Sequence, residues 1–126
     1  MKPAAPSPLF DRFGIALSGL CLVHCLALPV ALALLPVLAS SALGTLAQAE
    51  WFHAALLVPV VLVSGGVLGP RALVVRWLGP LLLFALGAMT GALFVAVQWQ
   101  EQAMTAGGAS LLILAHWLNL RERGRA

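Results

Sequence analysis

The chain has 126 residues, of which 62% are hydrophobic and 9% are charged. A soluble domain of this size has roughly a quarter of its residues charged. This composition therefore excludes a water-soluble globular protein and indicates that the chain lies in the lipid bilayer. The formal net charge is +3. The basic residues are scattered at the ends of apolar segments, which is typical of membrane topology and not of a nucleic-acid-binding surface.

Four apolar segments, each without an Asp, Glu, Lys or Arg, cover residues 13–38, 51–69, 77–99 and 102–120. Each is near or above the roughly 18 residues that indicate a membrane-spanning helix, and helices satisfy their own backbone hydrogen bonds in lipid. The sequence therefore predicts one all-α domain over residues 13–120, a membrane-embedded four-helix bundle with four transmembrane helices. Residues 1–12 are expected to form an N-terminal tail, and residues 121–126 a basic C-terminal tail.

Prolines, glycines and short polar stretches separate the predicted helices. Pro29 and Pro36 lie in the second half of the first segment, where they are expected to kink or end the helix. The stretch "ASSALGTLAQAE" separates the first two segments, and "GPRALVVR" separates the second from the third. The stretch "QEQ" is expected to be a tight turn, so that the last two helices form an antiparallel hairpin.

The distribution of charge predicts the topology. With four spans, every basic residue falls on one side of the membrane, whereas the opposite loops carry Glu50 and Glu101 and no base. The positive-inside rule then predicts a multi-pass protein of the inner (plasma) membrane with both termini in the cytoplasm. The tryptophans agree, because they fall at the helix ends, where membrane proteins carry an aromatic belt. The basic residues are Lys2, Arg12, Arg71, Arg76, Arg121, Arg123 and Arg125, and the tryptophans are Trp51, Trp77, Trp99 and Trp117.

Small residues indicate where helices approach closely. Gly87 and Gly91 have the GxxxG spacing in the third segment, and "AGGAS" gives the fourth segment a small-residue patch. Such residues let membrane helices pack closely. We expect the last two helices to pack there, although Gly87 and Gly91 could equally serve a homo-oligomer.

Both cysteines of the chain, and one of its three histidines, lie together in the first segment. Cys21, His24 and Cys25 in "LCLVHC" are spaced i, i+3, i+4 and share one face of a helix. Helix neighbours at i, i+4 have Cβ atoms about 5–6 Å apart, whereas a disulfide requires about 3.8 Å. The geometry favours two thiols, or two metal ligands, over an internal disulfide.

Thiolates select soft metal ions such as Cu(I) and Zn(II), and Hg(II) is a limiting soft case. Two thiolates would neutralise a divalent ion and lower its free energy inside the membrane, and His24 could accept a thiol proton as the metal binds. We therefore predict a metal site at Cys21, His24 and Cys25 that binds its ion transiently. No permanent cofactor is expected. The alternative is that the cysteines only pack and His24 is a hydrogen-bonded buried residue.

Other polar residues in the segments are weaker candidates for the metal site. Counting residues along the helices puts His53 about 10 Å to one side of His24 and His116 about 10 Å to the other. Asn119 is expected to serve helix packing or the membrane interface. Asp11 is expected to stabilise the N-terminus of the first helix through its charge.

The sequence resembles the MerC family of mercuric-ion transport proteins. The stretches "DRFGIALSGLCLVHC", "EWFH" and "LAHWLN" carry the resemblance, which extends from about Phe10 to Arg121. It implies that Hg(II) crosses the inner membrane on the thiols of Cys21 and Cys25. Mercury-resistance members carry a further cytoplasmic cysteine pair, whereas this chain ends "NLRERGRA". Either small cytosolic thiols accept the ion, or the ion is not mercury.

Together these features predict a MerC-like inner-membrane transporter of mercuric or another soft metal ion. The alternative is a metal-sensing or redox-sensing membrane protein, or an accessory protein, that binds metal without moving it. An enzyme is not expected, because the sequence contains no recognisable arrangement of nucleophile, base and orienting residue and no phosphate-binding loop.

Overall fold

The computed structural model describes residues 6–125, and these residues are almost entirely helical, without a strand. Two short helices, α2 and α3, join the first two of four longer helices. The helices are α1 (Pro8–Leu34), α2 (Pro36–Ala39), α3 (Ala42–Gln48), α4 (Glu50–Ala72), α5 (Leu78–Ala92) and α6 (Gln98–Arg125). The prediction of an all-α chain is confirmed.

Three of these helices are long and apolar enough to cross a membrane. They are α1, α4 and α6, with 27, 23 and 28 residues. Helix α5 is apolar but has 15 residues, which at 1.5 Å per residue is about 22 Å, less than the roughly 30 Å of a hydrocarbon core. The structure thus contains three candidate spans and a shorter apolar helix. That all four cross the membrane, and that both termini lie in the cytoplasm, stays a prediction.

Helix α1 differs from the first predicted helix at both ends. It begins at Pro8, inside the predicted tail, and it ends at Leu34 instead of near residue 38. The reason for the early end is Pro36, because a proline disfavours the helical conformation of the residue before it. Leu35 accordingly has φ −126° and ψ 77°, outside the helical region. Pro29 lies inside α1 without ending it.

The connection between the last two helices lies earlier in the chain than predicted. Helix α5 ends at Ala92 instead of residue 99, and α6 begins at Gln98, so the prediction of a turn at "QEQ" was wrong. Thr90 and Gly91 are weak helix formers, and α5 ends directly after them. The carboxylate of Glu101 lies in the first turn of α6, where a negative charge stabilises a helix N-terminus. Helix α6 also includes most of the predicted C-terminal tail.

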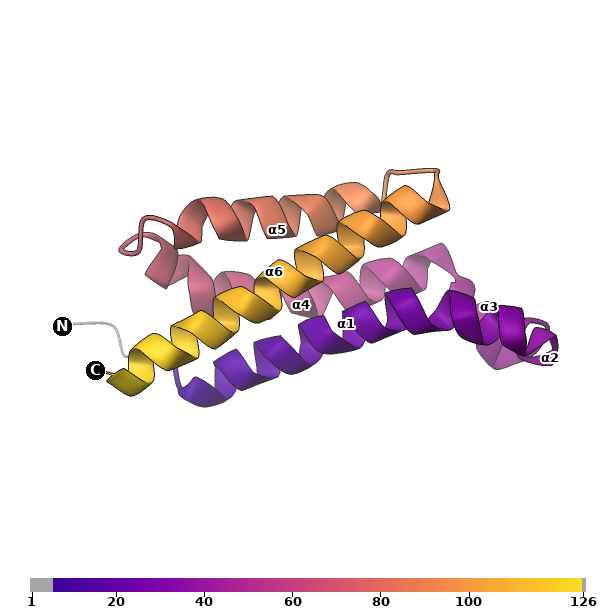
Figure 1. Cartoon of the computed structure of the whole chain (residues 1–126), viewed down its shortest axis with the longest axis horizontal. Coiled ribbons are helices and arrows are strands. Elements are labelled where there is room, and N and C mark those ends of the chain that lie inside the picture. Colours follow the sequence, from indigo (N-terminus) through magenta and orange to yellow (C-terminus); the bar gives the residue numbers. More distant parts are fainter. Residues whose placement is uncertain (1–5, 126) are drawn as a thin grey trace.

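The four longer helices run alternately in opposite directions (Figure 1). Helix α6 packs most extensively against α1 and α5, and α4 contacts both α1 and α5. The beginning of α1 and the end of α6 lie together at one end of the bundle, while α2 and α3 lie at the other end (Figure 1). We call these the terminal end and the α3 end.

The outer surface of the bundle is apolar. Large side chains such as Leu34, Leu62 and Leu83 are exposed, which water would penalise and lipid does not. The interior instead contains a tightly packed apolar cluster in which α4, α5 and α6 meet, with Val60, Leu68, Met89 and Leu112 almost fully buried. This arrangement is expected of a bundle whose solvent is lipid.

A glycine allows the closest approach of α5 to α6. A Cβ atom added at Gly108 would lie 2.5 Å from Cγ of Met89 and 2.7 Å from the backbone oxygen of Ala85. The prediction that the small-residue patch of α6 packs in the hairpin is therefore confirmed. A Cβ at Gly91 would lie 3.3 Å from Cε of Met104, whereas Gly87 is exposed and has no such neighbour within 4 Å, so the prediction that it packs in the hairpin was wrong. Homo-oligomerisation through Gly87 and Gly91 stays a prediction.

Substitution of Gly108 is expected to loosen this contact. Gly108→Ala should lower the free energy of unfolding by about 1–3 kcal/mol, because overpacking displaces Met89 and the backbone of α5. Gly107→Ala is the matched control, since no atom lies within 4 Å of the added Cβ, and alanine raises helix propensity. Thermal unfolding of both variants in detergent measures the difference. Equal stability of the two variants would contradict the predicted contact.

Candidate functional site

Helix α1 presents a polar and sulfur-containing face to the bundle. Its buried residues are Asp11, Gly14, Ser18, Cys21 and Cys25, and none of them is a large aliphatic residue. They are spaced alternately three and four residues apart, so they form one stripe along the helix. Leu20, Val23 and Leu26 lie on the exposed face instead. A membrane helix that turns its polar residues inward marks the interior of the bundle as the functional region.

The two thiols lie in the half of this stripe nearer the α3 end. Both cysteines are free and 7% exposed. Cys21 belongs to the apolar core cluster, together with Leu57 and Val60 of α4. The thiol of Cys25 donates a hydrogen bond of 3.8 Å to the backbone oxygen of Gln102 in α6.

His24 lies beside His53 of α4. Their ring centroids are 5.1 Å apart with an interplanar angle of 65°, and the ring of Phe52 is 5.2 Å from that of His24. The expected separation of about 10 Å was wrong. Helix α1 continues past the beginning of α4, and α2 and α3 bring the chain back along it, so the first turn of α4 lies level with His24.

A cavity of about 750 Å³ opens beside these residues. It lies between α1, the beginning of α4 and the beginning of α6, and its polar lining includes His24, Cys25, Glu50, His53, Glu101 and Gln102. Cys21 is one turn further from the α3 end and does not line it. Two carboxylates give this cavity a negative character, which attracts cations.

Among residues 6–125 no group of three His, Cys, Asp or Glu side chains converges as a metal site. The imidazole of His24 and the two thiols therefore do not form a closed three-ligand site in this conformation. Ligands in pairs remain, namely the two thiols one turn apart on α1 and the two adjacent imidazoles that line the cavity. Two-coordinate binding suits soft ions that exchange their ligands, whereas a closed four-ligand site would retain the ion.

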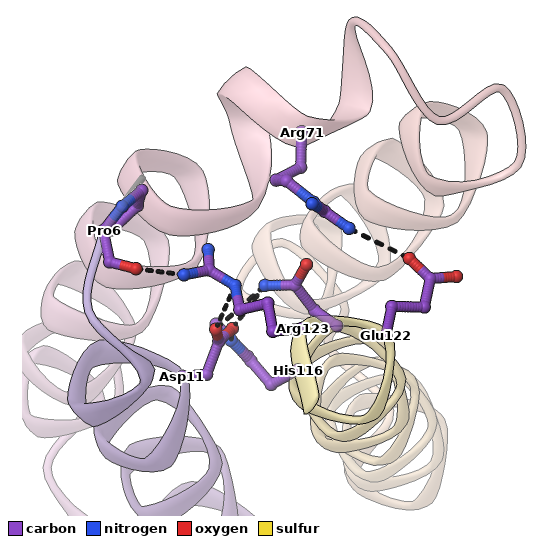
Figure 2. Close-up of polar contacts among 7 residues, drawn as sticks. Pro6, Asp11, Arg71, His116, Glu122 and Arg123 are labelled. Atoms are coloured by element: carbon purple, nitrogen blue, oxygen red, sulfur yellow. Dashed lines mark hydrogen bonds and ion pairs between the residues drawn. The ribbon is translucent and has the colours of Figure 1, made fainter. Parts of the chain in front are cut away.

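A second polar cluster lies at the terminal end, and Figure 2 shows it. The carboxylate of Asp11 is fully buried and accepts a 2.9 Å hydrogen bond from Nδ1 of His116. Nδ2 of Asn119 lies 2.9 Å from each oxygen of the same carboxylate, and Nε of Arg123 lies 3.4 Å from Oδ2. Three side chains of α6 thus surround one carboxylate of α1. We call these four residues, together with Ser64 of α4, which contacts His116 and is not labelled in Figure 2, the inner cluster.

Helix α4 joins the inner cluster through one hydroxyl. Oγ of Ser64 lies 3.1 Å from Nε2 of His116, and both side chains are fully buried. Because the Asp11 carboxylate accepts from Nδ1, the neutral ring carries its proton there and Ser64 donates to Nε2. Both nitrogens of His116 therefore have partners. Its partner Asp11 lies ten residues, about 15 Å, from Cys21 along α1. His116 does not join the thiols.

Most of the inner cluster was not predicted from the sequence. Asp11 was expected to be a helix-terminal charge, and Ser64 had no predicted role. A signal was available in α6, because His116, Asn119 and Arg123 have the i, i+3, i+7 spacing of one helix face. That face requires an acceptor, and Asp11 of α1 supplies it.

The family described as MerC mercury resistance protein matches residues 11–121 of the chain. The match covers α1 from Asp11, all the intervening elements and most of α6. No curated protein and no solved structure matched the chain.

Loss of the Asp11 carboxylate is expected to destabilise the contact between α1 and α6. Asp11→Ala should lower the free energy of unfolding by about 3 kcal/mol, because it leaves buried donors without their acceptor. Glu122→Gln is the control, since its ion pair with Arg71 at the same end is exposed and is worth about 0–1 kcal/mol. Unfolding in detergent compares the two variants, and a destabilisation by Glu122→Gln as large as that by Asp11→Ala would contradict this account.

Proposed function

Because the chain belongs to the MerC family of mercury resistance proteins, we propose that it carries mercuric ion, or another soft metal ion, across the inner membrane. In this proposal the thiols of Cys21 and Cys25 carry the ion. The observation that supports it most directly is the cavity at the α3 end, which reaches one thiol of the pair and stops before the other. With both termini in the cytoplasm, this cavity faces the opposite side of the membrane.

The first step is capture of the ion in the cavity. Glu50 and Glu101 attract a cation, and His24 and His53 offer two imidazole nitrogens as ligands. Nε2 of His24 is buried and has no hydrogen-bond partner among the described residues. Because imidazole is a weaker ligand than thiolate for a soft ion, the ion then passes to Cys25, which lines the same cavity.

The second step is transfer to the thiol pair. As each sulfur binds the ion, its S–H bond breaks and the proton leaves to His24 or to water in the cavity. Two thiols and Hg(II) give a neutral bis-thiolate complex and two protons, so no net charge enters the apolar interior. An uncompensated divalent ion there would cost tens of kcal/mol. Release follows by exchange with thiols on the cytoplasmic side.

Substitution of the thiols tests this function. Expression of the chain should raise Hg(II) accumulation by cells and their sensitivity to Hg(II). Cys21→Ser and Cys25→Ser should each reduce accumulation, and the double variant should match cells without the protein. Ala27→Ser is the matched control, because it places the same hydroxyl group on the exposed face of α1. If the double variant accumulates as much Hg(II) as the unsubstituted chain, the thiols do not carry the ion.

The same variants separate transport from binding alone. A sensing or accessory protein would bind Hg(II) through the thiols when purified but would not move it into proteoliposomes that contain glutathione. Stoichiometric binding without uptake in that assay would favour the second function.

His53 is expected to act in capture and not in transfer. His53→Ala should raise the Hg(II) concentration for half-maximal uptake by about tenfold, a typical cost of losing a metal-site partner, and should leave the maximal rate unchanged. Gln98→Ala, which alters another residue lining the cavity, is the control. Uptake kinetics in proteoliposomes measure both quantities. An unchanged half-maximal concentration would exclude His53 from the ion path.

A further inference from the structure

The buried stripe of α1 continues beyond the thiols to the terminal end. From Cys21 it passes through Ser18 and Gly14 to Asp11, a distance of about 15 Å. Each of these residues is small or polar and is buried against other helices of the bundle. An ion or thiol moving between Cys21 and the terminal end along this face of α1 must therefore pass Gly14.

The imidazole of His116 occupies that position. A Cβ atom added at Gly14 would lie 2.4 Å from both Cε1 and Nε2 of the ring. The ring therefore lies directly against the backbone of α1, and only glycine leaves room for it. It is held from both sides, by Asp11 at Nδ1 and by Ser64 at Nε2.

The two ends of the bundle differ accordingly. At the α3 end a cavity reaches Cys25. At the terminal end the inner cluster joins α1, α4 and α6, and Arg123 adds a hydrogen bond to the backbone oxygen of Pro6 (Figure 2). The order of serine, histidine and aspartate resembles a nucleophilic triad, but all three side chains are fully buried, so a substrate cannot reach Ser64.

We propose that the imidazole of His116, held against Gly14 by Asp11 and Ser64, is the inner gate of the ion path. The structure then represents the state that is open at the α3 end and closed at the terminal end. The proposal deepens the proposed transport function and names the element that separates its two sides.

Opening requires the ring to leave Gly14, and this movement breaks the hydrogen bond between Nε2 of His116 and Oγ of Ser64. Loss of the Ser64 hydroxyl is therefore expected to hold the ring less firmly and to raise access from the terminal end.

The thiol of Cys21 reports which side of the membrane reaches the path. In a Cys25→Ser background it is the only thiol of the chain. A charged, membrane-impermeant methanethiosulfonate is applied to oriented vesicles from either side, and a C-terminal tag identifies the terminal side. The rate of Cys21 modification from the terminal side should be low. His116→Ala should raise this rate by about tenfold or more, and Ser64→Ala by about fivefold, as expected for the loss of one hydrogen bond.

One control and a second test variant make the outcome decisive. Glu122→Gln breaks the exposed ion pair with Arg71 at the same end and should leave the rate unchanged. Ser64→Ala removes a single oxygen atom and is expected to fold even if His116→Ala does not. Fast modification of the unsubstituted background from the terminal side, an unchanged rate in Ser64→Ala, or an equal rise in Glu122→Gln would overturn the proposal. The assay uses no metal, so a failure of Hg(II) transport leaves its result interpretable.

Discussion

The buried carboxylate of Asp11 is the constraint on which the arrangement of this bundle depends. In lipid a carboxylate cannot be left unpaired, because each buried polar group without a partner costs several kcal/mol. Among the described residues α6 supplies its partners, through hydrogen bonds from His116 and Asn119 and an ion pair with Arg123. This requirement sets the rotation of α6 about its axis and its register against α1. The hydrophobic effect cannot set them, because the tails of lipids are as apolar as the leucines on the helix surfaces.

Once Asp11 faces α6, the helical repeat directs the rest of α1. Residues three and four positions apart share a face, so Gly14, Ser18, Cys21 and Cys25 point into the bundle with Asp11. The thiols are therefore interior groups for the same reason that the carboxylate is. The two ends of this buried stripe have different surroundings. At the α3 end the short α5 and the late start of α6 leave a cavity, whereas at the terminal end α1, α4 and α6 converge.

Much of the fold followed from patterns that are local in the sequence. Charge-free apolar segments predicted the helices, and Pro29 and Pro36 were expected to kink or end the first one, although its end was placed near residue 38 and not at Leu34. Where the prediction failed, the competing signals were weak. Residues 93–97 continue the apolar composition of α5, so hydropathy alone could not reveal that the helix stops at Ala92. The predicted position of His53 along the bundle axis, about 10 Å from His24, was wrong. That position depends on how α2 and α3 return the chain to α4, which counting residues along the helices cannot describe.

The sequence by itself determined the apolar, all-helical character of the chain, its resemblance to a family, and the presence of two thiols and an imidazole on neighbouring positions of one helix. These properties depend on residue type and on the 3.6-residue repeat, both of which are local. Only the tertiary structure decided that His53 would join His24, that a single thiol would reach the cavity, and that Ser64, His116 and Asp11 would meet against Gly14. Those contacts join residues 29, 52 and 105 positions apart in the chain, and helix packing alone brings them together.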